Sequence, residues 1–193
     1  MASLRPTLCF ESVGVLDIEV LQQEIPGLEG VVYDLDKTLT HQHGEGMPNA
    51  HLDVIGAINE LGLVQGIISN AASEEREERV RVFAKGIGAH IGAEVEVVTS
   101  RMVGGKKKPL RPVFDKMSEL LDIPNEHLCY IGDQLLKDVL GANRAGYGGS
   151  VLVAPYGEGD DPRVRFLQRP VEAVIRPFIG LPFLADNFWK IEH

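Results

Sequence analysis

The chain has 193 residues, 44% of them hydrophobic, which is enough for one domain with a sizeable core. Its formal net charge of −9 argues against broad binding to nucleic acid, and no apolar run reaches the ~18 residues of a membrane span. The two cysteines, Cys9 and Cys129, are far apart and form no CxxC pair. We therefore expect a reduced, intracellular setting, either the cytoplasm or an organelle matrix.

Short apolar runs alternate with helical patterns along most of the chain. The expected strands are 30–33, 63–68, 94–98, 127–131 and 150–153, and the expected helices are 51–61, 73–85, 112–121 and 135–145. This alternation is typical of βαβ units, whose buried parallel strands read as continuous apolar runs. We therefore predict an α/β fold, a three-layer Rossmann-like parallel sheet with helices on both faces.

No linker or repeat divides the chain, so we expect one domain over residues 1–193. Beyond Pro155 the alternation weakens, and the Gly- and Asp-rich run 157–162 predicts a turn. We expect residues from about 157 to 193 to form a C-terminal extension that packs on the domain.

This extension is basic and aromatic. Residues 163–193 carry five basic and three acidic side chains, a net +2, which leaves −11 for the rest of a chain at −9. The aromatic side chains are Phe166, Phe178, Phe183, Phe188 and Trp189. Either these aromatics pack on the sheet or on a partner chain, or the segment makes peripheral contact with an anionic membrane.

Two aspartates, Asp34 and Asp36, stand where the first apolar run ends and gives way to Thr38. Open α/β sheets bind ligands outside the carboxyl ends of their strands. Two carboxylates held together there repel each other unless they share a proton or a cation. Mg²⁺ is a hard divalent ion that suits such oxygen ligands.

Three further polar stretches follow strands or lie in loops on the same expected face. They are Ser69-Asn70, the loop 104–109 with its three lysines, and Gly132-Asp133 with Asp138 five residues later. Together the four stretches supply a carboxylate nucleophile, a general acid and base, a metal ligand, phosphate-binding groups and a lysine. This set of groups indicates phosphoryl chemistry.

The four stretches resemble the motifs of the haloacid dehalogenase (HAD) superfamily of aspartate-nucleophile phosphatases. The matching residues are Asp34-Leu35-Asp36-Lys37-Thr38, Ser69 with or without Asn70, Lys108, and Gly132-Asp133 with Asp138. Lys108 is favoured over Lys106 and Lys107 because Pro109 fixes the backbone beside it.

The resemblance implies a role for each of these residues. Asp34 would form an aspartyl-phosphate, and Asp36 would protonate the leaving alcohol and then activate water. Asp34, the backbone carbonyl of Asp36, and Asp133 would hold Mg²⁺. Ser69 and Lys108 would bind the transferring phosphoryl group, with Thr38 and Asn70 as further substrate contacts. Asp138 would support the metal site or pair with Lys108.

A closer resemblance, to the YqeG-like phosphatases of subfamily III-A, covers roughly residues 4 to 178. Its marks are Leu4-Arg5-Pro6, Asp17-Ile18, Lys108-Pro109 and the run 132–146. This subfamily includes mitochondrial phosphatidylglycerophosphate phosphatases, which implies a phospholipid substrate. Lys37 stands where the pattern usually has Asn and puts a new charge beside the nucleophile. The alternatives are a small soluble sugar or nucleotide phosphate, or a fold that binds without catalysis.

Two spacings complete the predictions. Thr38 and Asn70 are 32 residues apart, and Lys108 follows Asn70 by 38, so neither gap has room for a large cap domain.

The charge run 74–79 predicts a solvated helix face with i,i+4 pairs such as Glu75–Arg79.

Overall fold

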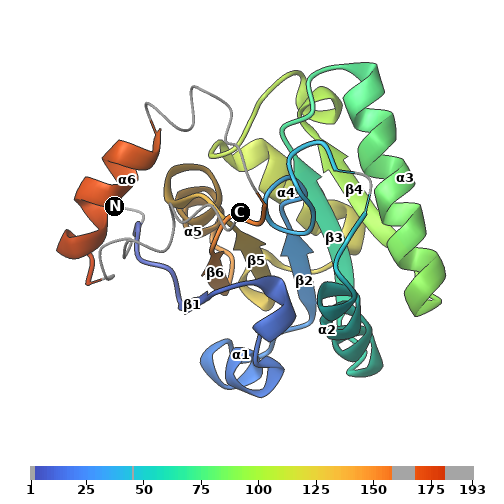
Figure 1. The fold of residues 1–193 in the computed structure, drawn as a ribbon, viewed down its shortest axis with the longest axis horizontal. Helices are drawn as coiled ribbons and strands as arrows, with labels where there is room; N and C mark the ends of the chain where they lie inside the picture. Colours follow the sequence, from blue (N-terminus) through green and yellow to red (C-terminus); the bar gives the residue numbers. More distant parts are fainter. Residues whose placement is uncertain (1–2, 45, 158–167, 181–193) are drawn as a thin grey trace, which may run out of the picture.

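A parallel sheet forms the centre of the protein in the computed structural model, which describes residues 3–44, 46–157 and 168–180 (Figure 1). Its strands are β1 (Leu8–Phe10), β2 (Gly30–Tyr33), β3 (Val64–Ser69), β4 (Val95–Thr99), β5 (Leu128–Gly132) and β6 (Gly149–Val153). They pair in the order β1-β6-β5-β2-β3-β4, and every pairing is parallel. The predicted α/β fold is confirmed.

Helices cover both faces of the sheet (Figure 1). One apolar core joins the sheet to α1 (Ile18–Glu24), α2 (Asn49–Glu60) and α3 (Glu74–Ile91). The other joins it to α4 (Arg111–Leu121) and α5 (Leu140–Ala145). Successive side chains of a strand point to opposite faces, so Val31 of β2 lies in the first core and Val32 in the second. The result is the expected three layers.

Short helical turns link these elements. They are η1 (Val13–Val15), η2 (Ser100–Val103), η3 (Asn125–His127) and the π-turn η4 (Leu135–Val139). The segment expected as one helix over 135–145 is therefore η4 followed by α5.

Other elements also differ from the predictions. Strand β1 and helix α1 were not predicted, because a three-residue edge strand and a seven-residue helix carry little periodic pattern. Helix α3 runs six residues past the expected end at Lys85, up to the left-handed cap at Gly92. The additional turns bury Ile87 against the first core.

The sheet changes direction beside β2. From β2 the chain adds β3 and then β4 on one side, whereas β5 and β6 lie on the other. The backbone N–H of Asp34 donates to the carbonyl of Ile131, so the residues that follow β2 and β5 lie next to each other. Such a switch point is where open α/β sheets place their ligand sites.

No cap domain is inserted between residues 38 and 108, residue 45 being outside the description. The chain forms α2 and β3 between Thr38 and Asn70, and α3, β4 and η2 between Asn70 and Lys108. The carboxyl ends of the central strands are therefore not covered by an inserted domain.

Part of the expected C-terminal extension is described. Helix α6 (Arg169–Phe178) lies against η4, where the N–H of Leu136 donates to Glu172. Ile179 packs against the cluster of Leu135, Val139 and Leu152. Most of the predicted 157–162 turn and the aromatic residues Phe166, Phe183, Phe188 and Trp189 lie outside the described residues. Among the helices of the described ranges, none has the length and apolar character needed to cross a membrane.

Candidate active site

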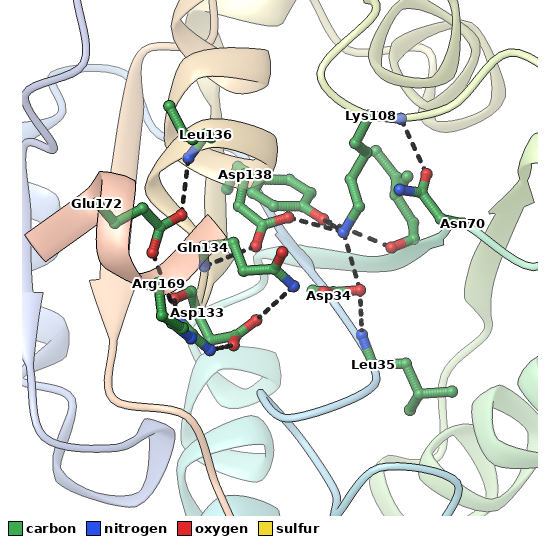
Figure 2. A network of polar contacts seen from close by, with 12 residues as sticks. Asp34, Leu35, Asn70, Lys108, Asp133, Gln134, Leu136, Asp138, Arg169 and Glu172 are labelled. Atoms are coloured by element: carbon green, nitrogen blue, oxygen red, sulfur yellow. Dashed lines mark hydrogen bonds and ion pairs between the residues drawn. The ribbon is translucent and has the colours of Figure 1, made fainter. Parts of the chain in front are cut away.

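A buried lysine lies at the centre of the polar network shown in Figure 2. The Nζ of Lys108 is 2.8 Å from an Asp34 carboxylate oxygen and 2.7 Å from one of Asp138. It also donates to the Tyr130 hydroxyl at 2.8 Å. Burial lowers the pKa of Lys108, but the neighbouring carboxylates of Asp138 and Asp34 outweigh burial and raise it above its usual value. The lysine therefore stays protonated.

These partners come from distant parts of the sequence. Asp34 follows β2, Tyr130 lies within β5, and Asp138 belongs to η4, while Lys108 precedes α4. Asn70 fixes the lysine loop, because its side-chain oxygen accepts from the backbone N–H of Lys108 at 2.8 Å. The adjoining Lys106 and Lys107 are exposed, so the structure separates Lys108 from its two neighbours.

Three carboxylates converge beside Lys108. One oxygen from each of Asp34, Asp133 and Asp138 lies within 4.8 Å of the other two, and all three residues are buried. Burial raises the pKa of Asp34 to about 8, where Lys108 opposes the rise and Asp138 and Asp133 add to it. Burial also raises the pKa of Asp133, against the lowering effect of Arg169. Full ionisation of this cluster therefore requires a further positive charge.

The donors fit a divalent cation. The buried charged groups of the network are Asp34, Asp133, Asp138 and Glu172 on the acidic side, and Lys108 and Arg169 on the basic side. Four carboxylates against two cations give −2 when all are ionised, which one divalent ion would neutralise. Oxygen-only donors suit hard ions such as Mg²⁺ rather than ions that prefer nitrogen or sulfur.

Asp36 has a different environment from Asp34. Its carboxylate accepts from Arg79 at 2.9 Å and from the N–H of His43 at 2.9 Å, and the side chain is 24% exposed. Arg79 also donates to the carbonyl of Gly44 at 2.8 Å. The Asp36 carboxylate therefore lies outside the group of three acids. Its predicted metal contact, made through the backbone carbonyl, stays a prediction.

The Arg79 contacts correct one expectation. Arg79 lies on α3, where the sequence predicts a pair with Glu75 on a solvated helix face. It bonds instead with Asp36 and Gly44, in the loop after β2, because its long side chain reaches across to that loop. Part of this charge run therefore belongs to the site.

The remaining predicted residues occupy the same end of the sheet. Ser69 is the last residue of β3 and is buried. The Thr38 hydroxyl is buried without a hydrogen-bond partner among the described residues, so it keeps its bonding capacity. Lys37 adopts a positive φ of 70°, and its Nζ donates to the carbonyl of Gly157 at 2.7 Å. Its ammonium is thus directed at the chain that follows β6.

Four residues of the site were not identified from the sequence: Arg79, Tyr130, Arg169 and Glu172. Tyr130 is part of an apolar strand, so the sequence pattern predicts a residue of the hydrophobic core. Arg169 and Glu172 have helical i,i+3 spacing, which predicts that they pair but not that they contact Asp133. The sequence alone groups Arg169 with the basic residues of the C-terminal extension. It is buried against Asp133, so it is not available to a membrane surface.

Comparisons with known proteins identify relatives of this chain. Residues 2–155 match the family described as mitochondrial PGP phosphatase. The chain is 30% identical over 145 residues to the probable phosphatase YqeG of Bacillus subtilis (strain 168), which covers 75% of this chain and 74% of that protein.

Two solved structures are similar in fold. One is an uncharacterized protein from Listeria monocytogenes serotype 4b, with a TM-score of 0.53 and 22% identity over 70% of this chain and 85% of that chain. The other is an uncharacterized protein from Corynebacterium glutamicum, with a TM-score of 0.51 and 19% identity over 81% of this chain and 98% of that chain. At these identities the likeness concerns the fold alone.

Proposed function

This chain belongs to the mitochondrial PGP phosphatase family, and from that premise we propose that it is a Mg²⁺-dependent phosphomonoesterase acting through an aspartyl-phosphate at Asp34. The protein is a HAD-superfamily hydrolase of phosphate esters, of the YqeG-like type. The observation that carries the proposal is the convergence of three buried carboxylates, two of them paired with Lys108, at the carboxyl ends of β2 and β5.

In the first half of the reaction, a carboxylate oxygen of Asp34 attacks phosphorus. A bond forms between that oxygen and phosphorus, and the ester P–O bond breaks with its electron pair on the leaving oxygen. Asp36 gives this oxygen a proton, so the product leaves as an alcohol. Lys108, which lies 2.8 Å from Asp34, faces the negative charge that develops on the phosphoryl oxygens.

In the second half, the Asp36 carboxylate takes a proton from water while the water oxygen attacks phosphorus. The bond between phosphorus and Asp34 breaks, its electron pair returns to the carboxylate, and inorganic phosphate leaves. Arg79, at 2.9 Å, orients the Asp36 carboxylate for both proton transfers. Ser69 and Thr38 offer hydroxyl groups to the phosphoryl oxygens.

Asp34 and Asp133 are the proposed metal ligands, together with the backbone carbonyl of Asp36. Asp138, which pairs with Lys108, completes the acidic group around them. When bound, Mg²⁺ supplies positive charge that offsets the phosphate dianion and favours the ionised form of Asp34.

The proposed substrate is phosphatidylglycerophosphate, whose hydrolysis yields phosphatidylglycerol. The family description supports this choice. The absence of an inserted cap between residues 38 and 108, residue 45 apart, also supports it, because a bulky or surface-bound phosphate needs open access. A small soluble sugar or nucleotide phosphate is the competing substrate class, and a binding protein without catalysis is the competing function.

A substrate panel tests these alternatives. Release of inorganic phosphate is measured from phosphatidylglycerophosphate in mixed micelles, a sugar phosphate, a nucleoside monophosphate and an aryl phosphate. Each is assayed with Mg²⁺ and with EDTA, for wild type and Asp34→Asn. We expect the lipid to have the highest kcat/KM, EDTA to abolish turnover, and Asp34→Asn to be inactive while folded.

Other outcomes are equally informative. A higher kcat/KM for a soluble phosphate would replace the lipid assignment and leave the mechanism in place. Turnover in EDTA would contradict the metal requirement. If all substrates failed and beryllium fluoride did not bind, the protein would be a non-catalytic binding protein.

Membrane contact by the C-terminal segment is a separate proposal. Arg169 is not available for this contact, because it pairs with Asp133. The apolar side chain of Phe178, at the end of α6, is 86% exposed and could contact a membrane. Sedimentation with anionic vesicles at low salt is expected to carry the protein into the pellet. Its absence from the pellet would remove the proposal.

A further inference from the structure

Helix α6 contributes an arginine to the acidic group, although it lies beyond the family match at residues 2–155. Arg169 is 7% exposed, and its guanidinium pairs with the Asp133 carboxylate. Its Nη1 also donates to the backbone carbonyl of Asp133 at 2.8 Å. One planar group thus bonds both the side chain and the main chain of a proposed metal ligand.

Glu172 fixes this arginine in place. It lies one helical turn from Arg169, at 3.3 Å from Nη1, and is 3% exposed. Its other carboxylate oxygen accepts from the N–H of Leu136 in η4, at 3.1 Å. Glu172 therefore ties α6 to the segment that also carries Asp138.

The arrangement leaves one side of Asp133 open toward the site. Arg169 bonds Oδ2 of Asp133, whereas Oδ1 accepts from the Gln134 side-chain amide at 3.5 Å. In Figure 2, Arg169 and Glu172 lie on the side of Asp133 that faces away from Asp34. Because Arg169 bonds Oδ2, the Asp133 carboxylate has little freedom to rotate, and its Oδ1 keeps a fixed direction.

We propose that Arg169 is a positioning residue for the cation site: it orients the Asp133 carboxylate, and Glu172 holds it there. This inference rests on the proposed function, because it assumes that Asp133 is a metal ligand. It makes α6 a required part of the active centre. Partners that orient metal ligands are typically worth 10- to 100-fold in metal affinity.

If Arg169 only neutralised the charge of Asp133, its removal would change the metal affinity in the opposite direction. A guanidinium that merely neutralises Asp133 competes with the cation, and its removal would tighten metal binding. A positioning guanidinium pre-orients the ligand, and its removal would weaken metal binding. The direction of the change in affinity therefore decides between the two roles.

Mn²⁺ provides a direct readout, because it accepts the same oxygen ligands and its free ion is counted by electron paramagnetic resonance. The full-length wild type is titrated beside Arg169→Gln, Arg169→Lys and Glu172→Gln. Arg111→Gln removes a positive charge from an exposed pair on α4, and Val174→Ala alters the exposed face of α6. Circular dichroism confirms that each variant is folded.

We expect Arg169→Gln to weaken Mn²⁺ binding by about 10-fold or more. Arg169→Lys is expected to weaken it less than Arg169→Gln but measurably, since one ammonium cannot reproduce the planar fork. Glu172→Gln should act in the same direction, and it decides the matter if Arg169→Gln does not fold. The two controls should bind as wild type does. At saturating Mn²⁺ the kcat of Arg169→Gln should recover, because the loss lies in metal affinity.

Unchanged or tighter Mn²⁺ binding by Arg169→Gln would overturn the inference, as would wild-type affinity in Arg169→Lys. Either result, with wild type binding Mn²⁺ and hydrolysing a phosphate ester, would leave the proposed function intact. A wild-type protein that bound no Mn²⁺ would instead overturn both.

Discussion

The ammonium of Lys108 lies 2.8 Å from the carboxylate of Asp34, and both side chains are largely withdrawn from solvent. Lys108→Met should lower kcat by roughly 10²- to 10³-fold, because a fixed positive charge no longer faces the transferring phosphoryl group. The same change leaves Asp138 without its cation, so the free energy of unfolding should fall by about 3–5 kcal/mol. Steady-state kinetics and urea unfolding measure the two effects. Lys107→Met is the matched control on the exposed neighbour, and wild-type kcat in Lys108→Met would contradict the assignment.

Arg79 bonds the Asp36 carboxylate, so Arg79→Met should impair proton transfer to the leaving group. General acid catalysis contributes about 10²- to 10⁴-fold, and it matters most when the leaving oxygen is basic. The loss in kcat should therefore be larger for an alkyl phosphate than for a nitrophenyl phosphate. Arg81→Met, which disrupts an exposed pair with Glu77, is the control. Equal losses for the two substrates would exclude a role through Asp36.

Gly132 lies so close to Asp138 that a Cβ at this position would overlap the carboxyl group. Gly132→Ala should therefore displace Asp138 from Lys108 and lower both activity and the melting temperature. Gly86→Ala is a suitable control, because nothing lies within 4 Å of the Cβ that it adds in α3. Calorimetry measures the melting temperatures of the two variants, and a phosphatase assay measures their activities. Normal activity in Gly132→Ala would show that the position of Asp138 is not critical.

The raised pKa of Asp34, about 8 against an ordinary 3.8, predicts a pH dependence. Without metal, the carboxyl group of Asp34 stays protonated in the folded state up to about pH 8, whereas in the unfolded chain it loses its proton above pH 3.8. The contribution of the protonated Asp34 to the free energy of unfolding is therefore lost as the pH rises from 3.8 toward 8. In EDTA, wild type should therefore lose stability over this range relative to Asp34→Asn. Mg²⁺ needs the ionised carboxylate, so it should raise the melting temperature more at alkaline than at acidic pH and release protons on binding. Melting curves across pH measure both effects, and an Asp34→Asn curve parallel to that of wild type would contradict the shifted pKa.

The central strands and the four polar stretches could be predicted because β2, β3 and β5 are apolar runs that end at polar residues. The HAD-superfamily resemblance drawn from those stretches is confirmed by the family match. Pro109 favoured Lys108 among three consecutive lysines, and Lys108 is the one that is buried against Asp34. Local pattern and motif order carried that information.

The supporting partners could not be predicted in this way. Arg79 lies 43 residues from Asp36, and Arg169 lies 36 from Asp133. Long, flexible side chains of this kind are ordinary on helix surfaces, so their targets depend on how helices pack on the sheet. Tyr130 reads as core until the fold places its hydroxyl against Lys108. Strand β1 has three residues, which is too short for an alternating pattern to register.

The central claim is that Asp34 carries the phosphoryl group, and chemical trapping of the intermediate tests it most directly. Wild type is mixed with substrate and Mg²⁺, quenched in acid during turnover and reduced with borohydride, which converts an acyl phosphate on aspartate to homoserine. Mass spectrometry of the peptide containing residue 34 should show homoserine at that position in wild type and none in Asp34→Asn. Continued phosphate release with an unmodified residue 34, or with homoserine at another aspartate, would contradict the account.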